Sequence, residues 1–153
     1  MSRRDQIKMT EAEVSAFLED QRVIAVASNG PRGWPHVMPL WYIVRAGEIW
    51  AWTYAKSQKT RNLERDPRAT LQIETGEQYH ELRGVMIEAS VVIHRDLEVV
   101  TDTGAEILGR YGSRAVGPQF MDVVRAQAAK RVALQFVAER IASWDHRKLG
   151  GVY

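Results

Sequence analysis

The segment KSQKTRNLERDPRATLQIE, residues 56–74, contains the side chains best suited to bind an anion. Ser57 is a typical N-cap residue, so Lys59 and Thr60 are predicted to lie in the first turn of a short helix. In that turn the backbone amides lack intrahelical partners and the helix dipole is positive, which makes cations unfavourable unless an anion joins them. A phosphate would satisfy the amides, the two hydroxyls, the Lys59 ammonium and the nearby Arg61. The alternative is a capped surface helix whose cations are solvated.

The rest of the sequence lacks the common catalytic motifs. There is no cysteine, no GxSxG elbow, no HExxH pair, no Walker loop and no dinucleotide-binding GxGxxG. The four histidines, at positions 36, 80, 94 and 146, lack the spacing of metal ligands, so no metal site is predicted. The loop GEQYHELRG offers Tyr79 and His80, residue types that can donate or relay a proton. A solvated Tyr–His pair is the alternative interpretation of this loop.

The composition fits one domain, residues 1–153, with mixed charge. The chain has 21 Lys and Arg against 19 Asp and Glu, a net charge of +2 with the signs interspersed, which argues against nucleic acid as a partner. No apolar run is long enough to span a membrane, and no apolar stretch follows the basic residues of MSRRDQIKMTEAEV. We therefore expect neither a membrane span nor secretion. The absence of cysteine fits a cytoplasmic protein.

Apolar periodicity and turn chemistry predict a mainly β protein with peripheral helices, an α+β fold class. A capping box formed by Thr10 and Glu13 starts the first helix, and further helices are predicted after Ser57, over 96–111 and over 118–130. Six strands are predicted, at residues 22–28, 34–45, 48–54, 68–74, 84–94 and 131–144. The turns NGPRG and AG are short, which implies antiparallel pairing and favours a barrel or a sandwich.

The strands predicted at 34–45 and 48–54 are apolar or aromatic on both faces. In the first strand, Trp34, His36, Met38, Leu40 and Tyr42 alternate with Pro35, Val37, Pro39 and Trp41. In the second strand, Trp50, Trp52 and Tyr54 alternate with Ile49, Ala51 and Thr53. A barrel strand that is open to water should have one polar face, so we expect something to cover the outer faces of these two strands. A second copy of the chain is one possible cover, and the terminal helices are the other.

The run KTRNLERDPRATLQIE, which follows a strand of the W-x-Y/T type, resembles the signature of the split β-barrel flavin and deazaflavin oxidoreductases, the group related to pyridoxamine 5'-phosphate oxidase. The stretch GWPHVMPLWY is similar to the family's strand after its first turn, and the last strand ends in SWDHRKLGG. The resemblance extends from about residue 10 to residue 94, whereas the region 96–130 aligns poorly. It implies a six-stranded antiparallel split β-barrel of the FMN-binding type, which forms a homodimer with two cofactor sites between the protomers.

The resemblance also implies a set of cofactor-binding residues. These are Lys59, Ser57, Thr60 and Asn62 for the phosphate, Trp52 and Thr53 for the ribityl chain, and His36, Met38, Pro39, Leu40 and Trp41 for the flat ring, partly through main-chain atoms. Each residue also has a structural interpretation. The apolar side chains would pack in the barrel, Ser57 would cap a helix, and His36 would make a buried hydrogen bond.

The resemblance implies F420, a deazaflavin coenzyme, rather than vitamin B6 chemistry. The arginine-rich strand of the pyridoxamine phosphate oxidases proper is not found where HVMPLWY stands, so vitamin B6 oxidation is not expected. The short chain and the KTRNL motif resemble the F420-using branch, with FMN as the alternative because both cofactors carry a similar tricyclic ring and a phosphate. The expected activity is hydride transfer between F420 and a small organic substrate, such as an activated C=C bond. The alternative from another class is non-catalytic binding of a flavin or haem.

Overall fold

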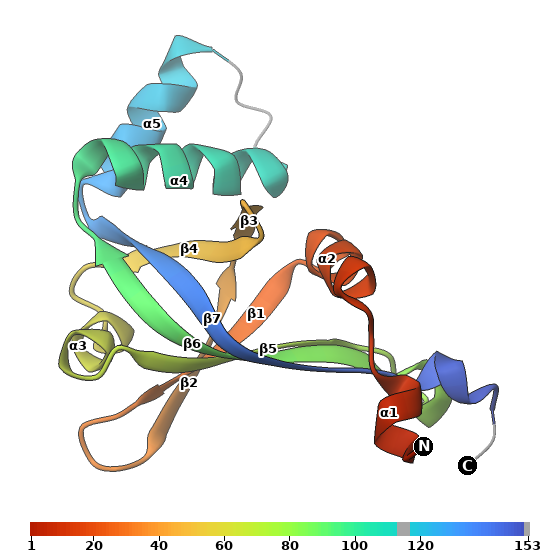
Figure 1. Cartoon of the computed structure of the whole chain (residues 1–153). Coiled ribbons are helices and arrows are strands. Elements are labelled where there is room, and N and C mark those ends of the chain that lie inside the picture. The colour runs from red at the N-terminus through yellow and green to blue at the C-terminus, as the bar shows by residue number, and fades with distance from the viewer. Residues whose placement is uncertain (113–116, 152–153) are drawn as a thin grey trace.

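The computed structural model describes residues 1–112 and 117–151. Within these residues the chain forms a seven-stranded antiparallel sheet, in the order β2-β1-β5-β6-β7-β4-β3, that curls into a barrel with helices outside it (Figure 1). The strands are β1 (Val23–Asn29), β2 (Pro35–Trp41), β3 (Ile43–Arg45), β4 (Glu48–Tyr54), β5 (Arg68–Thr75), β6 (Arg83–His94) and β7 (Arg131–Asp145). The helices are α1 (Arg3–Ile7), α2 (Glu11–Asp20), α3 (Gln58–Arg65), α4 (Leu97–Arg110) and α5 (Pro118–Ala128), with short 3-10 helices η1 (Tyr79–Glu81) and η2 (His146–Leu149). Over the described ranges, no helix combines the length and the apolar character needed to cross a bilayer.

The predicted mainly β split barrel is confirmed, but the number of strands differs from the prediction. The strand expected at 34–45 is two strands, β2 and β3, separated at Tyr42. At this residue the backbone N–H donates to the Tyr111 hydroxyl at 3.0 Å, and the carbonyl accepts from the Arg110 guanidinium at 2.6 Å, so side chains replace strand partners. β2 and β3 form the two edges of the sheet. The chain therefore passes at Tyr42 directly from one edge of the curled sheet to the other.

Tyr42 and Arg110 connect the barrel to two helices, α2 and α4. The Tyr42 side chain is fully buried and its hydroxyl lies 2.6 Å from the Leu18 carbonyl oxygen, and burial raises its pKa to about 12. Arg110, at the end of α4, donates to the carbonyls of Leu18, Glu19 and Gln21 at distances of 3.2, 2.7 and 2.7 Å. These carbonyls lack partners inside α2, so the Arg110 guanidinium caps α2 and joins it to the end of α4.

The barrel interior is filled by alternate residues of its strands, as the period of two along a strand requires. Its most buried members are Ile24, Val26, Leu71, Ile73, Val85, Leu134 and Phe136, each at most 2% exposed. Burying one such side chain contributes roughly 1.5–3 kcal/mol, so this cluster accounts for a large share of the stability. Because the interior is packed, a ligand has to bind at the ends of the barrel or on its outside.

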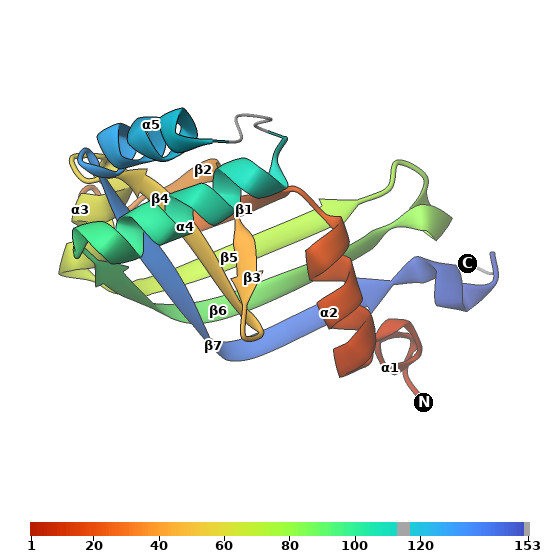
Figure 2. The same cartoon turned by 90° about the horizontal axis from the view of Figure 1, so that it is seen from above.

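Helices α4 and α5 cover the outer face of β4 (Figures 1 and 2). Trp50 and Trp52 belong to the cluster beneath α4, and Gly104 lies so close to the Trp52 ring that an added Cβ would come within 2.3 Å of it. Asp96 begins α4 by accepting from two backbone amides of its first turn. Of the two covers expected for the aromatic strands, helices of the same chain therefore cover the strand at 48–54.

The strands β5, β6 and β7 extend beyond the barrel and end at η1 and η2, on the far side of the molecule from α3 (Figures 1 and 2). η1 lies in the loop GEQYHELRG, and η2 follows the last strand. The two are joined by a hydrogen bond from the His146 amide to the Leu82 carbonyl at 2.9 Å. Neither short helix nor α1 was predicted from the sequence.

Candidate functional site

Lys59, in the first turn of α3, is a buried cation without a negatively charged partner. Its side chain is 5% exposed. The ammonium donates to the Thr53 hydroxyl at 3.3 Å, and within residues 1–112 and 117–151 it forms no ion pair. Burial lowers the pKa of Lys59, because an apolar environment disfavours the charged form. A nearby anion would remove this penalty, so the position is suited to bind one.

The start of α3 is fixed by the hydroxyls that flank Lys59. Ser57 is the N-cap residue and accepts from the Thr60 amide at 3.2 Å, while the Thr60 hydroxyl donates to the Tyr54 carbonyl at 2.9 Å. The amides of Gln58 and Lys59 make no hydrogen bond to the described chain. The two hydroxyls therefore build the turn, and two free amides accompany the buried ammonium.

Asn62 attaches α3 to the barrel. It is fully buried, donates to the Ser28 hydroxyl of β1 at 3.1 Å and accepts from the Gln58 side chain at 2.8 Å. The structure thus places Asn62 in the support of the helix, one turn from Lys59. Sequence reasoning missed Ser28 as part of this support. The signal was present, because Ser28 continues the inward alternation of Ile24 and Val26 as a polar residue.

His36 lies next to the start of α3. In the pairing of β1 with β2 it stands opposite Ser28, and its Nδ1 atom is buried without a hydrogen-bond partner. With Gln58 it lines a hollow of roughly 210 Å³ between the β1–β2 loop and α3. A buried polar atom without a partner is costly, so a ligand or water that enters this hollow would be stabilised by His36.

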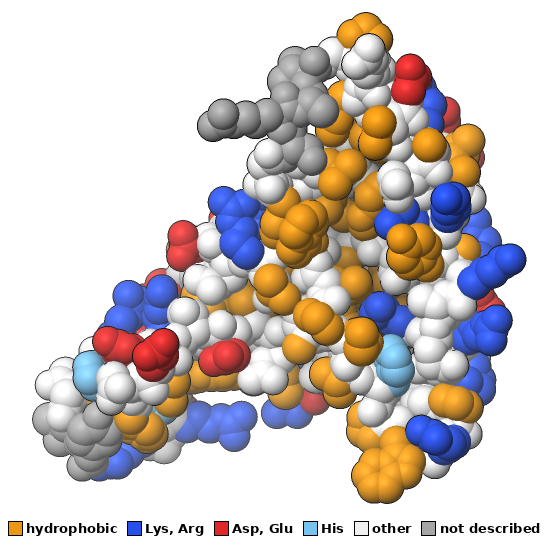
Figure 3. Space-filling view, turned by 180° about the vertical axis from the view of Figure 1, so that it is seen from behind, with side chains coloured by type: hydrophobic (Ala, Val, Ile, Leu, Met, Phe, Trp, Pro, Cys, Tyr) orange, Lys and Arg blue, Asp and Glu red, His pale blue; other side chains and the backbone are white. Residues whose placement is uncertain are grey.

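The other predicted ring-lining residues follow His36 along β2 on both faces of the strand. Met38 and Leu40 stand opposite Val26 and Ile24 of β1, whereas Pro39 and Trp41 point to the other face. Trp41 stacks on Tyr111, with ring centroids 4.5 Å apart. β2 is an edge strand, and Val37, Met38 and Trp41 are 56%, 46% and 50% exposed. Figure 3 shows the hydrophobic side chains gathered in a band on the side of the molecule that carries β2.

The structure does not bring Trp52 to Lys59. Trp52 precedes Thr53 along β4 and lies on the opposite face, where it packs against Gly104 beneath α4 and under the Arg131 guanidinium at 4.6 Å. Thr53, in contrast, is 7% exposed and hydrogen-bonds to Lys59. The two residues predicted to approach one ribityl chain therefore face different surroundings.

Tyr79 and His80, the proposed proton donors, also lie away from Lys59. β5 begins just after α3 and carries the chain along eight residues before η1. At about 3.3 Å per residue this is a separation of roughly 26 Å. The Tyr79 ring packs against His146, with centroids 4.5 Å apart, and His80 lies 4.0 Å from Glu81. Within one chain these two residues and Lys59 belong to different regions.

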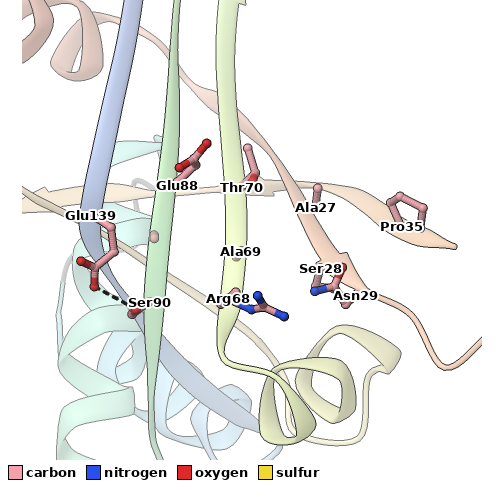
Figure 4. Close-up of a pocket in the computed structure, with 11 residues that line it drawn as sticks. Ala27, Ser28, Asn29, Pro35, Arg68, Ala69, Thr70, Glu88, Ser90 and Glu139 are labelled. Atoms are coloured by element: carbon pink, nitrogen blue, oxygen red, sulfur yellow. Dashed lines mark hydrogen bonds between the residues drawn. The ribbon is translucent and has the colours of Figure 1, made fainter. Parts of the chain in front are cut away.

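A larger hollow, of roughly 720 Å³, lies on the outer face of β1, β5, β6 and β7 (Figure 4). Its lining includes small residues, such as Ala27, and three charged side chains, Arg68, Glu88 and Glu139. Arg68 is paired with Asp66 at 2.8 Å, and Glu139 accepts from the Ser90 hydroxyl at 2.9 Å. None of the predicted cofactor-binding residues lines this hollow.

The curled antiparallel sheet with helices outside it defines a split-barrel protein. The chain belongs to the pyridoxamine 5'-phosphate oxidase family, because residues 10–145 match that family. A search of curated proteins gives no match.

Solved structures extend this relationship. The conserved hypothetical protein Rv2991 from Mycobacterium tuberculosis is 40% identical, with a TM-score of 0.91 over 100% of this chain and 95% of that chain. An F420 reductase is 20% identical, with a TM-score of 0.66 over 83% and 94% of the two chains. HutZ, the haem storage protein from Vibrio cholerae, is 18% identical, with a TM-score of 0.66 over 86% and 92%. At these identities the last two share the fold alone.

Proposed function

We propose that this protein binds the deazaflavin coenzyme F420 with its phosphate at the start of α3, and that it transfers a hydride between F420 and a small organic substrate such as an activated C=C bond. FMN in the same position is the alternative. The observation that carries the proposal is the buried ammonium of Lys59, which has a hydroxyl but no anion as its partner. A phosphate supplies the missing charge.

The donor set at the start of α3 fits a phosphate. Lys59 brings a full positive charge, and the amides of Gln58 and Lys59 lie at the positive end of the helix dipole. The buried Nδ1 of His36 offers a further hydrogen bond next to Gln58. These groups come from α3 and β2, which are connected through β1. Asn62 of α3 donates to Ser28 of β1, and Ser28 stands opposite His36 of β2.

The residues of this chain serve to bind, orient and exclude water, because the bound cofactor itself supplies the hydride. Lys59 fixes one end of the ligand, and Met38 and Leu40 on β2 offer apolar contact for a flat ring. This division of labour accounts for the lack of a catalytic motif in the sequence. The F420 reductase among the structures of this fold supports the choice of cofactor.

We also propose that the protein is a homodimer whose protomers meet on the β2 side. This edge strand leaves Val37, Met38 and Trp41 about half exposed, and it also carries His36, Pro39 and Leu40. Apolar side chains on an unpaired edge strand favour association. A second copy placed there would cover the apolar band and close the site from its open side.

Substitution of Lys59 tests the phosphate position. We expect Lys59→Met to weaken the binding of both F420 and FMN about tenfold, which is about 1.4 kcal/mol. The same change should raise the stability of the ligand-free protein by about 1 kcal/mol, because it removes a buried charge. Lys8→Met, which removes an exposed lysine at the end of α1, is the control for both measurements. Unchanged affinity in Lys59→Met would show that the phosphate does not bind at this position.

The lowered pKa of Lys59 gives a second test. Between that lowered pKa and the ordinary value of 10.5, the folded chain binds fewer protons than the unfolded chain, so the free energy of unfolding rises with pH in this window. A bound phosphate favours the charged lysine, so ligand affinity should fall as pH rises through the lowered pKa. Titrations over this pH range should show both trends in the native protein and neither trend in Lys59→Met.

Catalysis is tested separately from binding. Reduced F420 should be oxidised when acceptors with activated C=C bonds are added, which absorbance measures directly. Tight binding without any oxidation across a panel of acceptors would instead indicate a carrier or sensor, the non-catalytic alternative.

A further inference from the structure

A hollow of roughly 360 Å³ lies between one face of α2 and the place where β6 begins and β7 ends, and we call it the α2 hollow. Figures 1 and 2 show α2 beside this end of the sheet, away from α3. None of the residues proposed to hold the cofactor lines it. The lining consists of Glu13, Ala16, Phe17 and Asp20 from α2, together with Met9, Arg83, Asp145 and Arg147.

The walls of the α2 hollow are tied to each other on both sides of α2's start. The Met9 amide, just before α2, donates to the Ser143 hydroxyl of β7 at 3.1 Å. The Lys148 ammonium, in η2, donates to the Glu13 carboxylate at 2.7 Å and to the Lys8 carbonyl at 2.8 Å. The α2 hollow is therefore built by contacts between distant parts of the chain.

Arg83, at the start of β6, is a half-buried cation whose guanidinium has no hydrogen-bond partner. The other half-buried arginines of the described chain, Arg45, Arg110 and Arg131, each donate to a carboxylate or a carbonyl. The Arg83 guanidinium instead lies over the Phe17 ring, 5.4 Å from its centroid, and forms no hydrogen bond or ion pair with the described residues. A guanidinium with free N–H groups is suited to bind a carboxylate through two parallel hydrogen bonds.

Two of the three carboxylates in the lining are already paired within the chain. Asp145 stands opposite Arg83 in the pairing of β6 with β7, but its oxygens accept from the Arg147 guanidinium at 2.9 and 2.6 Å. These hydrogen bonds hold the pKa of Asp145 below its ordinary value. Glu13 is paired with Lys148. Neither acid is therefore free to neutralise Arg83.

Asp20 is the third carboxylate, and it has no cationic partner among the described residues. It accepts a hydrogen bond from the Gln21 side chain at 3.2 Å and forms no ion pair. Arg83 and Asp20 thus remain as one cation and one carboxylate in the same hollow, and they are not paired with each other. Asp20 would repel a simple anion and Arg83 would repel a simple cation, so the lining favours a ligand that carries both charges.

We propose that the α2 hollow binds a small zwitterion, an α-amino acid with an apolar side chain. Its carboxylate would lie on the Arg83 guanidinium, its ammonium would face Asp20, and its side chain would contact Phe17 and Met9. A volume of roughly 360 Å³ is at the small end of the range for ligand sites, which is about 300–1,000 Å³. This site is separate from Lys59, so the proposal does not depend on the proposed function.

The first test compares three ligands that differ by one charged group. L-leucine carries both charges, 4-methylpentanoate lacks the ammonium, and 3-methylbutylamine lacks the carboxylate. In two-dimensional NMR titrations of the native protein at low salt, we expect L-leucine to shift the amide signals of α2 and of the start of β6. The two analogues should bind at least tenfold more weakly, which is about 1.4 kcal/mol.

The second test removes each charge of the α2 hollow in turn. Arg83→Gln should weaken L-leucine about tenfold and make it bind no better than 3-methylbutylamine. Asp20→Asn should make L-leucine bind no better than 4-methylpentanoate. The control for Arg83→Gln is Arg45→Gln, because Arg45 is also half-buried and lies over an aromatic ring, Trp50, at 4.5 Å. The control for Asp20→Asn is Glu19→Gln, in the same turn of α2 but outside the lining.

The outcomes are clear-cut because Asp20 is exposed and its replacement leaves the fold intact. Equal binding of the three ligands, no binding of L-leucine, or L-leucine binding that survives both Arg83→Gln and Asp20→Asn would overturn the proposal. Lys59→Met should leave the binding of L-leucine unchanged. The result at the α2 hollow is thereby kept apart from the result for the cofactor.

Discussion

Two strands of this barrel, β4 and β2, have the same sequence pattern and opposite surroundings. Both carry apolar or aromatic residues on each face. On β4 the outward Trp50 is 9% exposed, because α4 and α5 lie over it. On β2 the outward Val37 and Trp41 are 56% and 50% exposed, although Trp41 stacks on Tyr111. A two-faced apolar strand therefore indicates that a cover exists without indicating which part of which chain supplies it.

The difference arises from where the helices lie relative to the two strands. α4 starts at the Asp96 cap directly after β6, and from there it crosses β7, β4 and β3 (Figure 2). β2 is at the other edge of the sheet, and no described helix crosses its outer face. The cover of β4 is therefore α4, whose length and cap are set by the sequence. A cover for β2 has to come from another molecule.

The largest effect on stability is expected from truncating a tryptophan on the covered strand β4. Trp50→Ala should destabilise the protein by about 3–5 kcal/mol, because it leaves a cavity beneath α4 and removes the stacking partner of His94 at 4.9 Å. Denaturant unfolding measures the loss. The matched control is Trp34→Ala, next to β2, where the ring is 75% exposed and the cost should stay below about 0.5 kcal/mol. Equal costs for the two tryptophans would contradict the difference between the strands.

A smaller change tests how tightly α4 sits on β4. Gly104→Ala should cost about 1–3 kcal/mol, because the new Cβ would come within 2.3 Å of the Trp52 ring and push the helix away. Gly109→Ala, on the same helix with nothing within 4 Å, should instead stabilise the protein by about 0.5–1 kcal/mol through its higher helix propensity. Thermal unfolding of the two variants should therefore move in opposite directions. A shift in the same direction would mean that α4 can adjust without cost.

Much of the fold could be predicted from the sequence, because its signals are local. The caps at Thr10 and Ser57 and the short turns marked the elements, and the alternation of apolar residues marked the barrel interior. The break at Tyr42 could not be predicted in this way. It depends on Arg110 and Tyr111, which lie far away in the sequence and take over the backbone hydrogen bonds of Tyr42.

For the candidate site as well, the local features were predicted and the packing was not. The helix start at Ser57 and the position of Lys59 were predicted, because capping acts over three residues. The burial of Lys59 against Thr53 is a property of packing and is visible only in the structure. Trp52 was expected beside Thr53 at the site, yet adjacent residues of a strand point to opposite faces, and α4 occupies the face of Trp52.

A charge placed on the uncovered strand β2 should have the smallest effect on stability. It is also the sharpest test of the difference between β2 and β4. Val37→Glu should leave the unfolding of the protein at low concentration within about 0.5 kcal/mol, because the side chain is exposed. If a second copy covers β2, the buried charge should weaken self-association at least tenfold, or about 1.4 kcal/mol, as measured by analytical ultracentrifugation. Val123→Glu on α5 is the matched control, because Val123 is also 56% exposed. Self-association that survives Val37→Glu but is lost in Val123→Glu would place the partner on α5 and leave β2 as a face for a different molecule.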